Sequence, residues 1–377
     1  MDYLPEPLQD SLLMVGSGDS MASAATGDGE DPARLVFGTV VRAAPIEDGG
    51  ELVLLDWEKK KIVKTTPMRP RDPTIGEDPD PRGNARGCRG VRCVNGQILA
   101  ATYHTIERFD SQLEPVGAIN GRLMAGLHEI DVTDQGTVWV SSTAIDAAVE
   151  YDLRTEQQCQ ALWPREMSSL QEALGVSPLS IDKSADNRLR FLNTSDTETS
   201  SHLHLNAVAE HEGVVYALCN DHAAVVDLTN QRVVLRHEGL RGAHNLKIDV
   251  GGTALVNDTY GRAVQFFDLE TGDRRRTIDL TEYQWVRDLI RWHFPAYWSR
   301  RLAVRMGSTD GVVARPLFVR GLASYGPYLF VGVSPASILQ IDRSSGSLVD
   351  AYRYSDDMRV CIHGLEVVPH LFGEDPS

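Results

Sequence analysis

The sequence predicts an all-β fold, a six-bladed β-propeller, and three observations lead to this prediction. A strand-like run that ends in aspartate recurs six times along the chain. Two strand-like runs precede the aspartate and one follows it, as in residues 246–278. The two ends of the chain supply complementary parts of one repeat. Short, regularly spaced strands indicate an all-β architecture, and four strands per repeat are typical of a propeller blade.

The aspartate that ends each of these runs is followed by turn residues. The six aspartates are Asp56, Asp110, Asp152, Asp227, Asp268 and Asp342. Each carboxylate can accept hydrogen bonds from the backbone N–H groups of its own turn. Successive aspartates are 54, 42, 75, 41 and 74 residues apart. The two largest spacings predict insertions of roughly 33 residues in a repeat of otherwise constant, blade-like length.

The first repeat is incomplete, and the C-terminus supplies what it lacks. The N-terminal repeat offers strand-like runs at 35–41, 51–56 and 61–65, but no first strand. A lone first strand lies at 362–368. We expect the two ends to complete one blade between them, because this closes the ring and removes two exposed sheet edges.

The domain organisation follows from these repeats. The propeller is expected to span residues 32–370, with a flexible, Gly- and Ser-rich segment at 1–31 and a tail at 371–377. Two helical insertions, 163–201 and 281–317, each connect the last strand of one blade to the first strand of the next. This connection places both of them on the face where the channel opens, as lid elements.

The insertions carry the helix signals of the chain. The first contains a short helix after Pro164 that ends before Gly175. The second contains a helix at 282–294 with Trp285, Leu289 and Trp292 on one face. Trp285 and Trp292 are therefore candidate substrate-binding residues under a lid. The alternative is that these aromatic side chains pack onto the propeller rim.

Composition limits the partners that we expect. The net charge of −16 repels phosphate backbones, so nucleic acid is not expected as a partner. No run of 18 apolar residues occurs, so neither a span nor a membrane partner is expected. Five cysteines without a pairing pattern indicate reduced thiols and a cytoplasmic protein.

The first strand of each blade lies innermost in a propeller, so residues that begin these six strands should form a ring at one mouth of the channel. The six lead residues are Arg89, His128, His204, His244, Arg320 and His363. His204 holds its place only if a bulge intervenes, because Asn206 matches Asn245 and otherwise puts Leu205 in the lead position.

Imidazoles that converge on one axis favour a shared metal ion, because they repel one another once protonated. We therefore predict a transition-metal cofactor, Zn or Fe(II), bound by His128, His204, His244 and His363. Nitrogen ligands argue against Ca and Mg. The forked guanidinium groups of the two ring arginines suit a small anionic substrate, and the alternative for them is an inter-blade salt bridge.

Loops between the second and third strands of the blades reach the same mouth. They carry four candidate catalytic or metal-supporting residues, Tyr103, Asp221, Asp258 and Tyr260. Asn-Asp turns are also ordinary loop chemistry, so each of the four is a weak signal alone.

The layout resembles that of the peptidyl-hydroxyglycine amidating lyases, six-bladed propellers that use three histidines on zinc with arginine and tyrosine in catalysis. This resemblance implies a zinc site at His128, His244 and His363. It implies catalytic partners among the ring arginines, and Tyr103 or Tyr260. Carotenoid cleavage oxygenases similarly place four histidines on iron, but in a ring of seven blades. Gluconolactonase-type propellers fit poorly, because this ring offers few carboxylates.

Local motifs also resemble a little-characterised bacterial propeller family. The matching residues are 204–206, 320–323 and 330–334, across blades four to six. This resemblance implies no activity.

Two hypotheses for function follow. The first is a metal-dependent enzyme of lyase, cyclase or hydrolase type, or a non-haem iron oxygenase, that acts on a small anionic metabolite. The second is a non-catalytic propeller scaffold that binds a protein or peptide at the channel mouth. The metal content of the purified protein separates the two.

Overall fold

The computed structural model describes residues 34–43, 47–68, 87–188, 203–308 and 317–368. The chain divides into a unit of residues 1–31 and a unit of residues 32–377, and the second unit contains the propeller. The expected flexible N-terminal segment and C-terminal tail lie outside the described residues, as do 189–201 and 309–316 of the two insertions.

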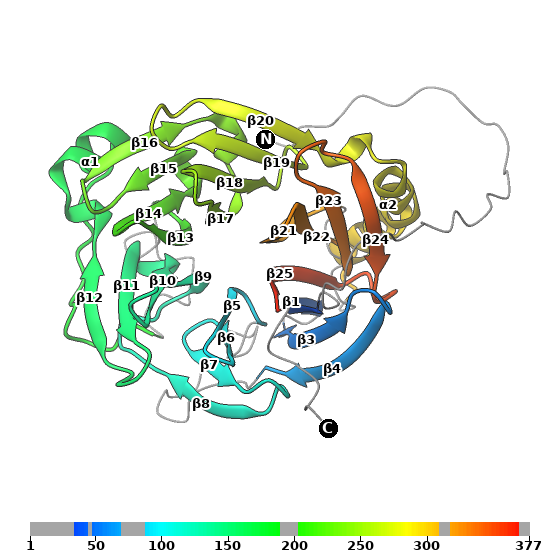
Figure 1. Ribbon diagram of the computed structural model, residues 1–377, viewed down its shortest axis with the longest axis horizontal. Helices are drawn as coiled ribbons and strands as arrows, with labels where there is room; N and C mark the ends of the chain where they lie inside the picture. Colours follow the sequence, from blue (N-terminus) through cyan, green and yellow to red (C-terminus); the bar gives the residue numbers. More distant parts are fainter. Residues whose placement is uncertain (1–33, 44–46, 69–86, 189–202, 309–316, 369–377) are drawn as a thin grey trace, which may run out of the picture. The chain divides into compact units, whose positions relative to one another are not determined.

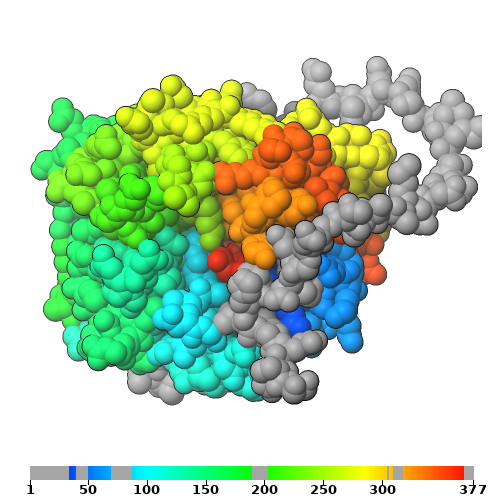
Figure 2. All heavy atoms as spheres, viewed as in Figure 1, coloured from blue at the N-terminus to red at the C-terminus, as the bar shows by residue number. Residues whose placement is uncertain are grey.

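Six antiparallel sheets surround a central axis, which confirms the six-bladed β-propeller (Figure 1). Their first strands lie innermost, and each contacts the first strands of both neighbouring sheets, so the ring is closed. Figure 2 shows the blades as adjoining sectors in chain order around this face.

Five of the sheets each consist of four consecutive strands, which run in chain order from the inside outwards. The second blade contains β5 (Val91–Val94), β6 (Gln97–Ala101), β7 (Ile106–Phe109) and β8 (Pro115–Ile119). The third contains β9 (Leu127–Val132), β10 (Thr137–Ser142), β11 (Ala147–Asp152) and β12 (Gln158–Leu162). The fourth contains β13 (Leu205–His211), β14 (Val214–Cys219), β15 (Ala224–Asp227) and β16 (Arg232–Arg236).

The fifth and sixth blades follow the same plan. The fifth contains β17 (His244–Ile248), β18 (Thr253–Asp258), β19 (Ala263–Asp268) and β20 (Arg274–Asp279). The sixth contains β21 (Val319–Tyr325), β22 (Tyr328–Val333), β23 (Ser337–Asp342) and β24 (Leu348–Arg353).

The first blade is built from both ends of the chain, as the sequence predicts. Its strands are β25 (Val360–Val367), β1 (Arg34–Ala43), β3 (Glu51–Asp56) and β4 (Lys61–Pro67), and the short β2 (Glu47–Gly49) pairs antiparallel with the end of β1. The C-terminal strand β25 pairs antiparallel with β1, with Leu35 opposite Val367 and Val41 opposite Val360. This pairing closes the ring.

The repeated aspartates close the turn after the third strand of every blade. Asp342 accepts the backbone N–H of Ser345 at 2.7 Å, and Asp268 accepts that of Thr271 at 3.0 Å. Asp56, Asp110, Asp152 and Asp227 likewise accept the backbone N–H groups of Lys59, Gln112, Thr155 and Asn230, respectively. The predicted role of these carboxylates is confirmed in all six blades.

Apolar side chains fill the six spaces between neighbouring blades, and each space holds one buried cluster. Both inserted helices add to such a cluster. Helix α1 (Ser168–Leu174) contributes Leu170 and Leu174 between the third and fourth blades. Helix α2 (Gln284–Arg305) contributes Val286 and Leu289 between the fifth and sixth. Each insertion therefore packs between the two blades that it connects.

Helix α2 differs from its predicted length, because it continues through Pro295 to Arg305. A proline removes one backbone hydrogen bond and crowds the carbonyl four residues earlier. That carbonyl belongs to Arg291, and both Arg291 and Pro295 are exposed. Solvent can therefore satisfy the freed carbonyl, so the helix tolerates the proline.

Candidate functional site

Three of the predicted ring histidines lie together on the inner strands, His128 and His244 at the start of theirs and His363 four residues into β25. Candidate ligand atoms of His128, His244 and His363 all lie within 4.8 Å of one another. The centroids of their imidazole rings are 5.6 to 6.3 Å apart. The residues come from β9, β17 and β25, which are alternate blades of the ring. The ring of first strands thus gathers imidazoles that are more than 100 residues apart in the sequence.

The environment of His244 fixes the proton on one ring nitrogen. Its Nδ1 lies 3.0 Å from the carbonyl oxygen of Gly242 and 2.9 Å from the hydroxyl of Thr259. A carbonyl only accepts, and the Thr259 hydroxyl donates its own proton to the carbonyl of Val319 at 2.9 Å. Nδ1 must therefore carry the hydrogen, which leaves a lone pair on Nε2.

His128 repeats this arrangement two blades away. Its Nδ1 lies 2.9 Å from the hydroxyl of Thr143 and 3.3 Å from the carbonyl of Gly126. Thr143 donates to the carbonyl of Leu205. On the other side of the ring, Arg89 Nη1 donates to His128 Nε2 at 2.9 Å, which agrees with a lone pair on that atom. Both imidazoles therefore present Nε2 as an acceptor or a ligand.

Sequence reasoning missed the two threonines that orient these rings. Thr143 follows His128 by 15 residues, and Thr259 follows His244 by the same interval. Each lies just after the second strand of its blade, in the loop that reaches the ring. The shared spacing was the signal that could have identified them.

His363 is the third member and the one without polar partners. It is 1% exposed, and neither of its ring nitrogens has a hydrogen-bond partner among the described residues. A buried polar group without a partner costs free energy, so such groups in folded proteins generally face an ion, water or ligand. His363 therefore marks the point in the ring where a bound species is expected.

All three imidazoles are held in the neutral form. Burial lowers the pKa of each well below the usual value near 6.5. The positive charges of Arg89 and Arg320 lower these pKa values further. Neutral imidazole is the form that binds a metal ion.

His204 lies beside this group but outside it. The ladder pairs Leu205 with Cys219 and then Ala207 with Leu218, so Asn206 is bulged just as Asn245 is bulged after His244. Leu205 is therefore the counterpart of His244 and occupies the lead position. His204 thus precedes that position, with a left-handed φ of 52°. Its ring centroid is 5.6 Å from that of His128. Burial lowers the pKa of His204, while the nearby carboxylates of Asp221 and Asp146 raise it.

The two ring arginines both lie beside the histidine group. Beyond its bond to His128, the guanidinium of Arg89 lies 5.8 Å from the ring centroid of Tyr103. The guanidinium of Arg320 lies 4.0 Å from the ring of Phe318, which in turn packs against His244. Two cations thus border three neutral imidazoles, an arrangement that attracts an anion.

Of the four candidate catalytic residues, only Tyr103 lies directly beside the ring. Tyr103 is close to the ring, next to Arg89. Tyr260 is largely exposed and covers Gly242, whose carbonyl binds His244. Asp221 is exposed, and its negative charge raises the pKa of His204. The Asp258 carboxylate accepts hydrogen bonds from the backbone N–H of Gly261 at 2.6 Å and from the side-chain amide of Gln265 at 3.0 Å. These bonds hold the turn between β18 and β19.

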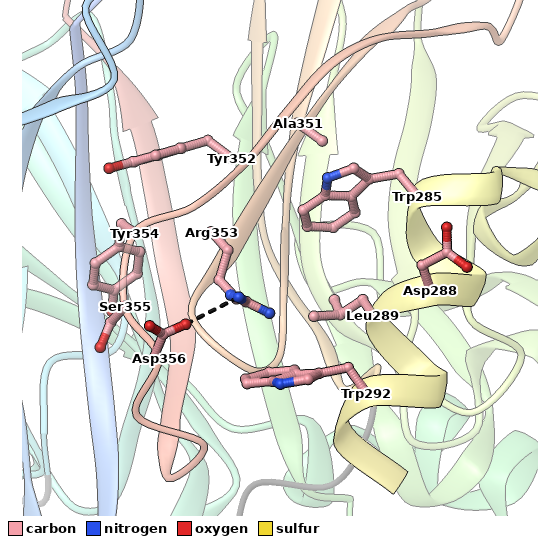
Figure 3. A pocket seen from close by; sticks show the side chains of 10 residues that line it. All are labelled: Trp285, Asp288, Leu289, Trp292, Ala351, Tyr352, Arg353, Tyr354, Ser355 and Asp356. Carbon is pink, nitrogen blue, oxygen red and sulfur yellow. Dashed lines mark ion pairs between the residues drawn. The ribbon is translucent and has the colours of Figure 1, made fainter. Parts of the chain in front are cut away.

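The two tryptophans proposed for substrate binding lie at the rim, apart from the ring. Trp285 and Trp292 project from α2 toward β24 and the segment after it (Figure 3). There they line a hollow of about 730 Å³, in which the Arg353 guanidinium lies 3.9 Å from the Trp292 ring. In Figure 1, α2 stands outside β24, on the far side of that blade from the inner strands. This position of Trp285 and Trp292 matches the alternative in which the two side chains pack onto the propeller rim.

Comparisons with known proteins support the fold and assign no activity. No family model and no curated protein matches the sequence. A structure of a Bacteroides caccae protein of unknown function matches with a TM-score of 0.52 and 11% identity, over 89% of this chain and 99% of that one. A structure of a nidogen/laminin complex matches with a TM-score of 0.49 and 10% identity, over 89% of this chain and 98% of that one. The similarity to the Bacteroides caccae structure, at 11% identity, supports the fold alone.

Proposed function

We propose that this protein is a metal-dependent enzyme whose transition-metal ion is bound by His128, His244 and His363. The observation that carries the proposal is the buried His363 imidazole, which has no hydrogen-bond partner among the described residues and has a candidate ligand atom within 4.8 Å of those of His128 and His244. A shared metal ion would bind a lone pair of His363 together with those of His128 and His244, whose Nε2 atoms here face Arg89 and Asn206.

The donor set narrows the choice of metal. Three neutral imidazoles suit Zn or Fe(II), and the lack of oxygen donors in the group disfavours Ca and Mg. Zinc would supply a Lewis acid for lyase or hydrolase chemistry. Ferrous iron would make an oxygenase possible. The identity of the bound metal therefore also decides the reaction class.

The flanking positive charges favour an anionic substrate. Arg89 and Arg320 already lower the pKa values of the histidines, and they would repel a divalent cation as well. An anion offsets this repulsion, and a guanidinium binds carboxylate or phosphate through two parallel hydrogen bonds. We therefore propose a small anionic metabolite as the substrate, with Tyr103 next to Arg89 as the first candidate for acid–base chemistry.

The His128–Arg89 contact would have to change on metal binding. Arg89 Nη1 donates to His128 Nε2, the same lone pair that a metal would take. Release of Arg89 from His128 frees a donor for the anion. Metal and anion are therefore expected to bind cooperatively.

The decisive experiment is metal analysis of the full-length protein. It is purified in the absence of oxygen, reconstituted separately with Zn and Fe(II), and examined by mass spectrometry. We expect close to one equivalent in the wild type and a strong loss in His363→Ala and His244→Ala. His211→Ala, at the far end of β13, is the matched control and should retain the metal.

Thermal unfolding of the same variants separates a lost site from a lost fold. Metal content below about a tenth of an equivalent in a folded, reconstituted wild type would overturn the proposal. That result would leave the scaffold hypothesis, in which the mouth binds a protein or peptide.

A further inference from the structure

Helix α2 carries an unusual concentration of exposed apolar side chains. Ten large hydrophobic residues of the described part of the chain are exposed, and five of them lie in or directly after this helix. They are Trp292, Phe294, Trp298, Leu302 and Met306. The other five are scattered singly over the blades, so the group on α2 forms the principal apolar patch among the described residues.

Four of these side chains form one stripe. Phe294, Trp298, Leu302 and Met306 follow one another at intervals of four residues, which places them on the same side of a helix. The stripe is about 18 Å long at 1.5 Å per residue. The side chains are 45%, 43%, 58% and 76% exposed, and the rings of Phe294 and Trp298 contact each other edge to face. The stripe is therefore an ordered surface that points away from the blades.

The opposite side of α2 is occupied by the propeller. Val286, Leu289 and His293 are buried, and Figure 3 shows Leu289 and Trp292 directed at the residues around β24. The inner side thus holds the helix in place, and the stripe is not needed for that packing. The aromatic and aliphatic side chains on the outer side require another explanation.

The charge of α2 is opposite to that of the whole chain. Gln284–Arg305 contains five arginines and one aspartate, a net charge of +4, whereas the chain carries −16. Arg291, Arg301 and Arg305 are exposed beside the stripe. Arg301 donates to the Tyr297 hydroxyl at 3.1 Å and lies 5.5 Å from the Trp298 ring. The surface therefore interleaves cations with apolar groups.

A basic helix with Trp, Phe and Leu on its exposed face matches the chemistry of an anionic lipid surface. A second copy of this chain fits less well, because a symmetric contact would set the arginines of one helix against those of the other. Nucleic acid fits less well too, because Leu302 and Met306 offer no ring on which a base can stack, and the rest of the chain is acidic.

We propose that the outer face of α2 is a peripheral docking surface for membranes rich in anionic phospholipid. The helix lies along the headgroup region, with Phe294, Trp298 and Leu302 inserted toward the acyl chains and the arginines beside phosphate groups. No helix among the described residues is long and apolar enough to cross a bilayer, and this mode of binding needs none. The proposal departs from the expectation of no membrane partner, which considered only a membrane span.

Vesicle flotation of the full-length protein tests the proposal. Vesicles of phosphatidylcholine alone are compared with vesicles that also contain phosphatidylglycerol. We expect flotation only with the anionic vesicles, and a loss of flotation as salt rises from about 0.05 to about 0.5 M. Trp298→Ser with Leu302→Ser, and separately Arg301→Glu with Arg305→Glu, should weaken binding roughly tenfold or more.

A matched control removes exposed apolar side chains elsewhere. Val250 and Val349 are 95% and 51% exposed on the blades, so Val250→Ser with Val349→Ser should leave flotation unchanged. Brominated acyl chains should quench tryptophan fluorescence in the wild type and much less in Trp298→Phe.

Three results would overturn the proposal. The first is a wild type that does not float with anionic vesicles at low salt. The second is flotation that the α2 variants leave intact. The third is a dimer in solution that the α2 variants dissociate, which would assign the stripe to self-association. None of these readouts depends on a metal in the channel.

Discussion

The Nδ1 atom of His244 and the hydroxyl oxygen of Thr259 lie 2.9 Å apart within the fifth blade, and Thr259 connects this contact to the sixth. Thr259 belongs to the same blade as His244, and its hydroxyl donates to the Val319 carbonyl on the inner strand of the next blade. The orientation of the imidazole thus depends on how blades meet. Thr143 contacts His128 Nδ1 and donates to the Leu205 carbonyl of the next blade in the same way, so the arrangement occurs twice in the ring.

The threonine contact predicts a measurable effect on metal affinity. Thr259→Val removes the hydroxyl and leaves the Gly242 carbonyl as the remaining acceptor for Nδ1. Loss of such a supporting contact typically weakens metal binding by about 10- to 100-fold. Competition with a chelator of known affinity measures the change. Thr259→Ser should restore most of the affinity, and equal affinities for wild type and Thr259→Val would contradict the prediction.

The ring arginines predict anion binding. Arg320→Met and Arg89→Met should each weaken the binding of phosphate or a small dicarboxylate to the metal-loaded protein by roughly 10- to 100-fold, because each removes a charged hydrogen-bond donor. Isothermal calorimetry is the measurement, and Arg236→Met on the outer strand β16 is the control. Unchanged affinity together with a lower melting temperature would instead give the arginines a structural role between blades.

A glycine at the closure of the ring predicts an effect on stability. A Cβ atom at Gly364 would overlap the Arg89 carbonyl oxygen and lie 2.8 Å from the backbone nitrogen of Val91. Gly364→Ala must therefore push β25 away from the second blade, and we expect a loss of about 1–3 kcal/mol in the free energy of unfolding.

Denaturant titration measures this loss. Gly117→Ala is the matched control, because the nearest atom to its added Cβ is the Arg108 side chain at 3.9 Å. A Gly364→Ala variant as stable as the control would show that β25 can shift freely.

The turn aspartates predict how the fold responds to acid. Hydrogen bonds from the backbone and hydroxyl groups of Ser344 and Ser345 lower the pKa of Asp342 to about 2, from a usual value of 3.8. Because the folded state holds the carboxylate ionised, the stabilisation is present above the usual pKa and is lost as the pH falls toward 2. Asp342→Asn should therefore flatten the fall of the melting temperature between about pH 4 and about pH 2.

The control for this prediction is Asp134→Asn, at an exposed turn position. A steep acid transition that both variants share with the wild type would mean that Asp342 contributes nothing to acid sensitivity.

The sequence by itself determined the number of blades, the closure of the ring and the ring histidines. These features could be predicted because they depend on local and periodic signals. The turn aspartates recur with the blades, strand runs are recognisable from short segments, and the lead position of each inner strand repeats in register. Three of the four predicted histidines lie in one group for this reason.

Only the tertiary structure decided the chemistry around that ring. The ladder of β13 puts Leu205 in the lead position, as the match of Asn206 to Asn245 indicated, and leaves His204 one residue before it; only the paired strands decide between the two registers. The position of α2 at the rim depends on the apolar space between the fifth and sixth blades, into which Val286 and Leu289 fit. The isolation of His363 and the proton position on His244 depend on atoms from neighbouring blades. A sequence specifies which residues enter the ring, whereas hydrogen bonds and burial arise only when blades far apart in the chain meet.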